Sequence, residues 1–188
     1  ETWNGSSWTE TGDLNTARQA IAGDGTTTAM IVAGGTTGSN VAVSETFNGS
    51  TWTEVNDLNT ARSQVAASGS STAAFASAGA TPPGTAVANV ESWNGSSWTE
   101  TTDVNTARRF LGGSGTSTST LIFGGAHPNK TETESWDGSS WTEVADLASA
   151  RYGLGSGGTN NTSAIAFGGN TGSNVASTEE WSFTGLDP

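Results

Sequence analysis

Apolar residues are grouped along this chain into short runs, which are separated by stretches of glycine, serine and threonine. The most hydrophobic runs, at 30–33, 121–123 and 165–167, each stop at a Gly-Gly pair. Continuous apolar runs of this length between turn residues are typical of strands that are buried on both faces. We therefore predict a buried strand at each of these positions.

A weaker class of run precedes each of these strands. It is rich in small residues such as alanine and glycine, and it occupies 19–22, 64–67 and 110–112. Turns rich in glycine, serine and threonine follow at 24–26 and 68–70. The weaker runs predict narrow strands, of a kind that fits where several sheets converge on an axis.

Two further strands complete the unit. The third strand ends at Glu-x-Trp or Glu-x-Phe, and Asn-Gly, or Asp137-Gly138, follows it. Both residues of such a pair tolerate positive φ, so the pair predicts a two-residue hairpin turn. The turn leads into a fourth strand, Trp-Thr-Glu. The predicted unit is therefore all-β, with four antiparallel strands.

This unit recurs through the whole chain. Glu1, Glu45, Glu91 and Glu134 each begin a copy of the pattern E-[ST]-[WF]-[ND]-G-S-[ST]-W-T-E, and a fifth copy begins at Glu179. The interval of about 45 residues is the size of one blade of a β-propeller. The distance from glutamate to arginine is always 17, and from arginine to the second residue of the Gly-Gly position it is 17, 17, 17 and 18, whereas from there to the next glutamate it is 10, 12, 9 and 10. A constant framework with one variable loop is characteristic of a rigid repeat.

The order of a Gly-Gly pair, an acidic residue two positions before an aromatic residue, a tryptophan and the sequence D-[LV]-x-[TS]-A-R resembles the kelch repeat. The likeness covers almost the whole chain. Ala78-Gly79 departs from it in the second copy, and Trp or Phe stands where kelch repeats usually have tyrosine. The resemblance implies a β-propeller whose blades pack radially around a channel.

We predict a single domain, 1–188, with four blades of four strands. The predicted blades are 18–56, 62–101, 108–145, and 151–183 together with 1–10. Pairing of Trp8-Thr9-Glu10 with the strand that ends at Trp181 is predicted to close the ring and to remove a free sheet edge. Trp3 and Trp181 hold the same repeat position, so one of them is then surplus. An open array and a ring of several chains are the alternatives.

The amino-acid composition argues against two classes of binding partner. The 188 residues have a formal net charge of −12 and include only six lysines and arginines, so neither nucleic acid nor an anionic membrane is an expected partner. The sequence contains no cysteine, and no apolar stretch is long enough to predict insertion into a membrane. The chain starts at Glu1 without a signal peptide, as a processed or partial product does.

Two residue types recur in every copy and are interpreted as parts of the scaffold. The second tryptophan of each hairpin is predicted to pack between neighbouring blades, and the arginine to tie blade to blade through a repeated Glu or Asp. The tryptophans are Trp8, Trp52, Trp98 and Trp141, and the arginines are Arg18, Arg62, Arg108 and Arg151.

The sequence contains few residues that could carry out catalysis. One histidine and one tyrosine, His127 and Tyr152, are too few for the copper centre of oxidases that share kelch propellers. A catalytic pair of carboxylates remains an alternative, because some of the 18 acidic residues can meet on one face. Asn-Gly-Ser matches the N-glycosylation acceptor in three copies, but Asp137 in the fourth copy favours a turn. We expect no enzyme activity, no cofactor and no metal site.

The loops between the second and third strands are the segments that vary freely, and binding sites on repeat scaffolds tend to lie on such loops. They span 36–42, 80–89, 126–132 and 170–176. The candidate ligand-binding residues in them are Thr37, Asn40, Pro82, Thr85, His127, Asn129, Lys130, Thr171 and Asn174. Neutral drift in solvated loops is the alternative interpretation.

These observations favour a non-catalytic binding or display module on a cell or virion surface, fibre-like or adhesin-like, which recognises a glycan or a protein through the variable loops. Near-identical repeats, acidity and abundant Gly, Ser and Thr resemble phage and bacterial surface proteins. One alternative is a structural module that self-associates into an oligomer or a filament. The other is a carbohydrate-processing enzyme with acidic residues around one pocket.

Overall fold

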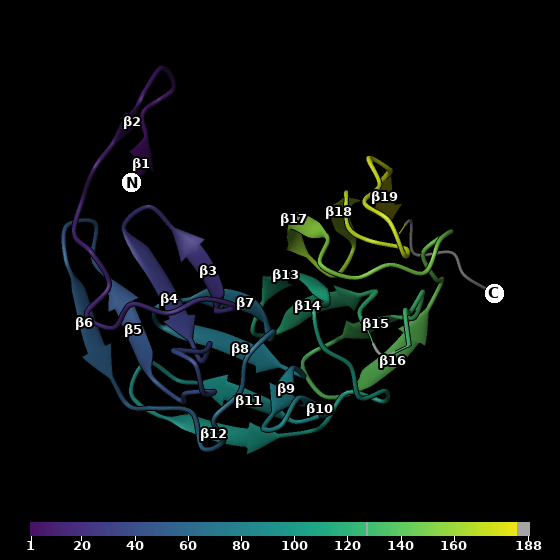
Figure 1. Ribbon diagram of the computed structural model, residues 1–188, viewed down its shortest axis with the longest axis horizontal. Helices are drawn as coiled ribbons and strands as arrows, with labels where there is room; N and C mark the ends of the chain where they lie inside the picture. Colours follow the sequence, from purple (N-terminus) through teal and green to yellow (C-terminus); the bar gives the residue numbers. More distant parts are fainter. Residues whose placement is uncertain (127, 184–188) are drawn as a thin grey trace.

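The structure is a computed structural model that describes residues 1–126 and 128–183. This part of the chain forms an all-β propeller with four blades, as predicted (Figure 1). Three blades are four-stranded antiparallel sheets and the fourth has three strands. The described residues include no helix that is long and apolar enough to cross a membrane.

The strands follow one another in sequence from the axis to the outside of each blade. Blade 1 contains β3 (Ala22–Thr26), β4 (Ala29–Ala33), β5 (Ser44–Phe47) and β6 (Trp52–Val55). Blade 2 contains β7 (Ala66–Ser70), β8 (Ala73–Ser77), β11 (Val90–Trp93) and β12 (Trp98–Thr101), and its long loop carries the small hairpin of β9 (Ala80–Thr81) and β10 (Thr85–Ala86).

The second half of the chain repeats this order. Blade 3 contains β13 (Gly112–Thr116), β14 (Ser119–Phe123), β15 (Thr133–Trp136) and β16 (Trp141–Val144). Blade 4 contains β17 (Gly155–Asn160), β18 (Ser163–Phe167) and β19 (Thr178–Ser182). A separate N-terminal hairpin pairs β1 (Thr2–Trp3) with β2 (Trp8–Thr9).

The innermost strands pack in sequence around the axis, β3 on β7, β7 on β13 and β13 on β17 (Figure 1). They begin later than the sequence predicted, because the segments 24–26 and 68–70 belong to β3 and β7 and are not turns. Their small residues are needed for close packing: a Cβ atom on Gly113 of β13 would approach the Cβ atom of Ala66 of β7 to 2.9 Å. Glycine and serine here mark strands near the axis rather than turns.

The second strands carry the core. In β8 and β14 alternate residues face the preceding and the following blade, and both sets are buried, as the continuous apolar runs predicted. In β4, Ile31 and Ala33 pack toward blade 2, and Val32 is buried as well. Ile31 of β4 packs with Ala74 and Ala76 of β8, and Phe75 of β8 packs with Ile122 of β14. Blade-to-blade contact is therefore the main apolar contact of the molecule.

The Asn-Gly turns have four residues rather than the predicted two. Phe47 pairs with Trp52, and the intervening Asn48 side chain accepts hydrogen bonds from the N–H groups of Ser50 and Thr51, each at 2.9 Å. This Asx geometry fixes the loop through the side chain of its first residue. Asp137 makes the same bonds in blade 3, and they lower its pKa to about 2.

Closure of the ring by β2 and β19 is not observed, which corrects the sequence-based prediction. Among the described residues β2 pairs with β1 alone and β19 pairs with β18 alone. Figure 1 shows the hairpin and blade 4 on opposite sides of an opening. The three blade-to-blade contacts repeat the same backbone hydrogen bonds, and the two ends of the array remain apart (Figure 1). Trp8 is consequently 65% exposed rather than packed between blades.

One prediction concerns the inner strands. Gly69 of β7 has a φ of +116°, and a Cβ atom there would approach the Cα atom of Ala74 to 2.7 Å. We expect Gly69→Ala to lower the free energy of unfolding by about 1–3 kcal/mol, because the substitution adds both backbone strain and a clash. Gly157→Ala is the control, since its Cβ atom meets nothing closer than 3.6 Å. Urea denaturation followed by circular dichroism measures both, and equal stability of the two variants would contradict the prediction.

Candidate functional site

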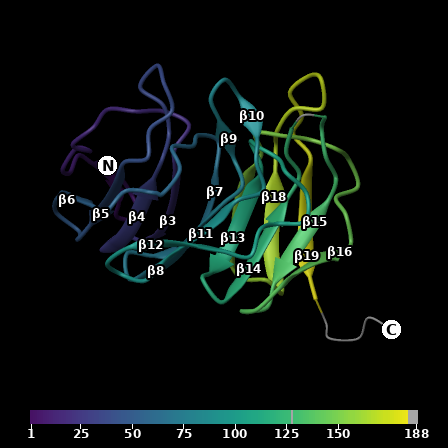
Figure 2. The ribbon, with the colours of Figure 1, turned by 90° about the horizontal axis from the view of Figure 1, so that it is seen from below.

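The variable loops lie together on one rim of the propeller. Figure 2 shows the loops that follow β4, β8 and β18 on the same side of the molecule, opposite the Asn-Gly turns. The connections between blades reach the same rim, because Gln19, Ser63, Arg109 and Tyr152 each pair through the backbone with a residue of the adjacent variable loop. The rim is therefore built from two sets of segments, the variable loops and these connections.

A polar cleft of about 380 Å³ lies between the loops of blades 1 and 2. Its walls include Asn40, Pro82 and Gly84 of the loops, and Gln64 and Arg109 of the connections. Asn40 donates a hydrogen bond from Nδ2 to the carbonyl oxygen of Ala80 at 2.7 Å, which joins the two loops. Gln64 Oε1 and Arg109 Nε are buried without a hydrogen-bond partner among the described residues. These two atoms lie beneath the surface, and the cleft wall itself carries the amide side chains of Asn40 and Gln64 and the guanidinium group of Arg109.

A second cleft of about 420 Å³ has aromatic walls. Phe110 and Tyr152 lie with their ring centroids 5.9 Å apart and their planes at 50°, and Asn170 and Asn174 of the blade 4 loop face the same space. The guanidinium carbon of Arg109 lies 5.8 Å from the centroid of the Phe110 ring, within the range of a cation–π contact. Phe110 is therefore adjacent to both clefts.

The predicted loop residues are distributed unevenly over this rim. Asn40 and Pro82 line the polar cleft and Asn174 lines the aromatic cleft. Thr37, Thr85 and Thr171 are exposed and line neither cleft. Asn129 and Lys130 are half-buried in the blade 3 loop, and His127 lies outside the described residues.

Lys130 is engaged within its own loop. Its Nζ donates to Glu132 Oε1 at 3.0 Å. Burial raises the pKa of Glu132, but hydrogen bonds from its own backbone amide and from Lys130 outweigh burial and hold that pKa below its ordinary value. Lys130 is therefore a weaker candidate for ligand binding than Arg109.

Sequence reasoning missed Gln64, Arg109, Phe110 and Tyr152 as rim residues. A signal for them exists: the residue after the repeated arginine is Gln19, Ser63, Arg109 or Tyr152 in successive copies, although the residues before it are nearly constant. Variation among copies that are otherwise alike marks this position as part of the variable surface. The next position also varies, and at Gln64 and Phe110 it has a positive φ of 60° and 56°.

The repeated arginines lie away from the rim surface and hold each blade together. Each one pairs with the repeated glutamate of its own blade, at 2.7, 2.8, 2.6 and 3.0 Å in blades 1 to 4. The prediction that the ion pair joins two blades is wrong: the backbone carbonyl of Arg62, not its side chain, accepts a hydrogen bond from blade 1. Burial lowers the pKa of Arg62 and Arg108, and the paired glutamates offset this only in part.

Glu45 shows how the blade is fixed around the ion pair. Its carboxylate accepts hydrogen bonds from Asn15 N and Nδ2 at 2.7 and 2.8 Å, besides the pair with Arg18. Burial raises the pKa of Glu45, but these contacts outweigh burial and lower it overall. The ionised carboxylate therefore adds stability that is complete above the ordinary pKa of 4.5 and is lost as the pH falls through the lowered value.

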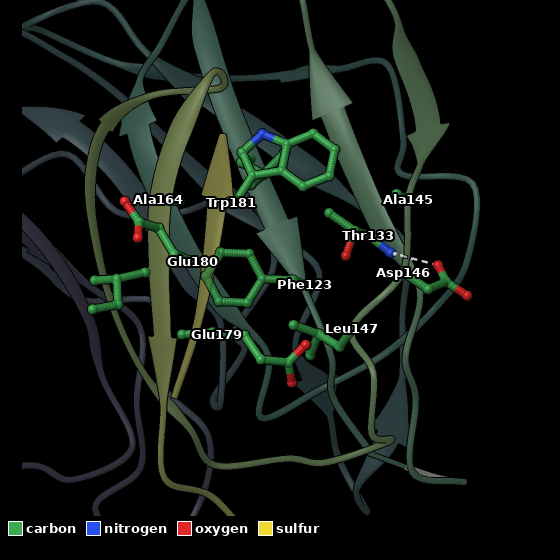
Figure 3. Close-up of a pocket in the computed structure, with 12 residues that line it drawn as sticks. Phe123, Thr133, Ala145, Asp146, Leu147, Ala164, Glu179, Glu180 and Trp181 are labelled. Carbon is green, nitrogen blue, oxygen red and sulfur yellow. Dashed lines mark hydrogen bonds between the residues drawn. The ribbon is translucent and has the colours of Figure 1, made fainter. Parts of the chain in front are cut away.

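A third hollow lies between blades 3 and 4, and no residue of the variable loops lines it. Figure 3 shows Phe123, Leu147 and Trp181 around it, with Thr133 and Asp146 on the blade 3 side. Its volume is about 60 Å³. Leu121 and Ala164 complete its apolar floor.

Metal ligands do not gather in the described part of the chain, where no group of three or more His, Cys, Asp and Glu residues could hold an ion. No protein-family model matches the sequence, and no curated protein is similar to it. The interpretation of the site therefore depends on the geometry of the clefts.

Proposed function

We propose that this chain is a kelch-type propeller that acts as a non-catalytic binding module, with the rim clefts as its ligand site. The observation that carries the proposal is the separation of constant from variable residues. The repeated Trp, Arg and Glu residues are mostly buried within and between blades, whereas the residues that differ among copies line two clefts on one rim. In repeat scaffolds such a division separates the framework from the binding surface.

The chemistry of the clefts favours a carbohydrate ligand. Aromatic faces at Phe110 and Tyr152 suit the apolar faces of sugar rings, while Asn, Gln and Arg side chains suit hydroxyl groups. The side chains of Gln64 and Arg109 line the polar cleft and give such a ligand one neutral and one charged hydrogen-bonding group. We propose a display position on a cell or virion surface, where the strong negative charge of the chain limits nonspecific association.

The test is binding of the purified chain to an array of glycans and cell-envelope polysaccharides. Arg109→Ala and Tyr152→Ala are expected to weaken binding about tenfold or more, which corresponds to roughly 1.4 kcal/mol for each lost contact. Gln19→Ala is the matched control, because Gln19 holds the same repeat position but lines neither cleft. Absence of binding to every glycan, or equal binding by all variants, would reject the carbohydrate proposal.

A second candidate function, assembly into an oligomer, is favoured by the open ends of the propeller. It depends on residues at the two ends of the blade array, which are different from those that line the rim clefts.

A further inference from the structure

Blade 4 contains an unfilled place for a fourth-strand tryptophan. In blade 2 this residue is Trp98, whose Nε1 donates to Ser44 Oγ of blade 1 at 3.0 Å. Thr133 of blade 3 holds the same repeat position as Ser44, and it lines the hollow between blades 3 and 4. Blade 4 ends at its third strand, β19, so the described chain places no tryptophan of its own there. The hollow is thus the counterpart of the Trp98 site.

The N-terminal hairpin carries the matching residue. β2 has the sequence of a fourth strand, and Trp8 holds the repeat position of Trp98 and Trp141. Those two residues are 6% and 7% exposed, whereas Trp8 is 65% exposed. One end of the molecule therefore presents the side chain for which the other end has an open site.

The broad faces of the end blades show the same correspondence. Ile165 and Phe167 of β18 are 41% and 47% exposed, but Leu121 and Phe123, at the same positions in blade 3, are 1% and 2% exposed because blade 4 covers them. At the other end, an apolar cleft of about 420 Å³ separates the N-terminal hairpin from the face of blade 1 and is lined by Met30, Phe47 and Trp52. Exposed apolar patches of this kind indicate an interaction surface.

The backbone hydrogen bonds between blades also leave one unpaired group at each end of the array. Gly35, Gly79 and Gly125 each donate from the backbone amide to the carbonyl oxygen of the arginine in the next blade, at 2.8 to 2.9 Å. The equivalent N–H of Gly169 has no acceptor among the described residues, and the carbonyl oxygen of Arg18 has no donor there. Backbone N–H and C=O groups are rarely left without a hydrogen-bond partner once they are buried, so these two groups favour contact with another blade.

A second backbone row repeats the pattern. Gln64 donates to Ala20, Phe110 to Gln64 and Gly153 to Phe110, at 2.8 to 3.0 Å. The N–H of Ala20 and the carbonyl oxygen of Gly153 are the ends of this row within the described chain. Each end surface therefore offers one donor and one acceptor, in the positions that the other end surface requires.

We propose that blade 4 of one chain docks against blade 1 of a second copy of this chain, with β2 of that second copy as its fourth strand. The contact would bury the exposed face of β18, fill the hollow with Trp8 and continue both backbone rows. A second copy of the chain is the expected partner, because the same blade-to-blade contact already occurs three times within the molecule. Closure within one chain is disfavoured, since it requires all three existing contacts to change their angle.

The contact has two specific consequences. β1 and β19 hold the same repeat positions, with Trp3 and Trp181 equivalent, so β19 of one chain replaces β1 as the partner of β2. Ala148 stands where Asn59 and Asn105 donate to the carbonyl oxygens of Trp98 and Trp141 on the fourth strand. The joined blade therefore lacks one hydrogen bond, and Ala148→Asn is expected to tighten the association several-fold.

Disulfide trapping tests the proposal, because the chain has no cysteine. Ser68 of β7 and Thr120 of β14 touch across an internal contact, with their hydroxyl oxygens 2.8 Å apart. Gly157 and Met30 hold the same repeat positions at the two open ends. Single variants Gly157→Cys and Met30→Cys, mixed and mildly oxidised, are expected to give a covalent dimer at about twice 18.9 kDa. The internal double variant Ser68→Cys/Thr120→Cys is the control and should close within one chain.

Each outcome of the experiment decides the question. A mixed dimer that is lost on adding Trp8→Ala to the Met30→Cys chain supports the proposal, provided that circular dichroism shows folded variants. If the double variant Gly157→Cys/Met30→Cys closes within one chain at micromolar concentration, the occupant is the chain itself and the proposal is wrong. Absence of any dimer, with the internal control oxidised, also overturns it. Because both partners are acidic and the contact is apolar, added salt should increase the dimer yield.

Discussion

Replacement of Trp98 by alanine is expected to lower the free energy of unfolding by about 3–5 kcal/mol, the range for large aromatic residues in a core. Trp98 is 6% exposed and lies between blades 1 and 2, where the centroid of its ring is 5.3 Å from that of Trp93. The substitution opens a cavity and also leaves the hydroxyl group of Ser44 without the indole as a partner. Urea denaturation followed by far-ultraviolet circular dichroism gives the free energy directly.

Trp8→Ala is the matched control for this prediction. The two tryptophans have the same repeat position and nearly the same flanking sequence, but Trp8 is mostly exposed. At a protein concentration low enough to keep the chain monomeric, its loss is expected to change the free energy of unfolding by less than about 0.5 kcal/mol. Equal destabilisation of both variants would mean that Trp8 is buried against a blade, and it would contradict the exposed position of the N-terminal hairpin.

Removal of Arg62 is the second substitution with a large expected effect. Its guanidinium group pairs with Glu91 at 2.8 Å and donates to the carbonyl oxygens of Ala78 and Asn89, and both charged side chains are fully buried. Arg62→Ala leaves the carboxylate of Glu91 buried without its positive partner and also removes the hydrogen bonds from the guanidinium group to the carbonyl oxygens of Ala78 and Asn89. Breaking a buried pair in this way costs about 3–5 kcal/mol, mostly through the charge that remains. Chemical denaturation at neutral pH measures the loss.

Two variants separate the charge effect from general damage. Arg151→Ala removes the same residue from blade 4, where the side chain of the partner Glu179 is 26% exposed and water can solvate it, so a clearly smaller loss is expected. Arg62→Met/Glu91→Leu removes both charges and is expected to be more stable than Arg62→Ala alone. A double variant that is less stable than the single one would contradict this explanation.

The repeat pattern predicted most of the fold. The strands at 30–33, 121–123 and 165–167, the four blades and the buried arginines follow from residue spacing, because each copy must bury the same positions to stack on its neighbour. The inner strands were placed too early in the sequence. The sequence Asp24-Gly25-Thr26 is typical of a turn, yet crowding at the axis also selects glycine in the inner strands.

The ends of the array could not be predicted from repeat positions. Trp8 and Trp98 lie in almost identical local sequences, and only the presence of a neighbouring blade decides which of them is buried. The rim site was predicted in part, since Asn40, Pro82 and Asn174 line the clefts but Arg109 and Tyr152 were overlooked. Variation in loop length does not reveal these two residues, because their position varies in residue type at constant segment length.

The common orientation of the rim loops has a consequence for how strongly a surface would be bound. Every blade-to-blade contact preserves the side on which the loops emerge, so copies joined by the same contact would present all their clefts in one plane (Figure 2). Several weak sites facing one densely coated surface act together, and their combined avidity can exceed the single-site affinity by about 10²–10⁴. Such an array would discriminate sugar density as well as sugar identity, holding a crowded polysaccharide and releasing the same sugar free in solution.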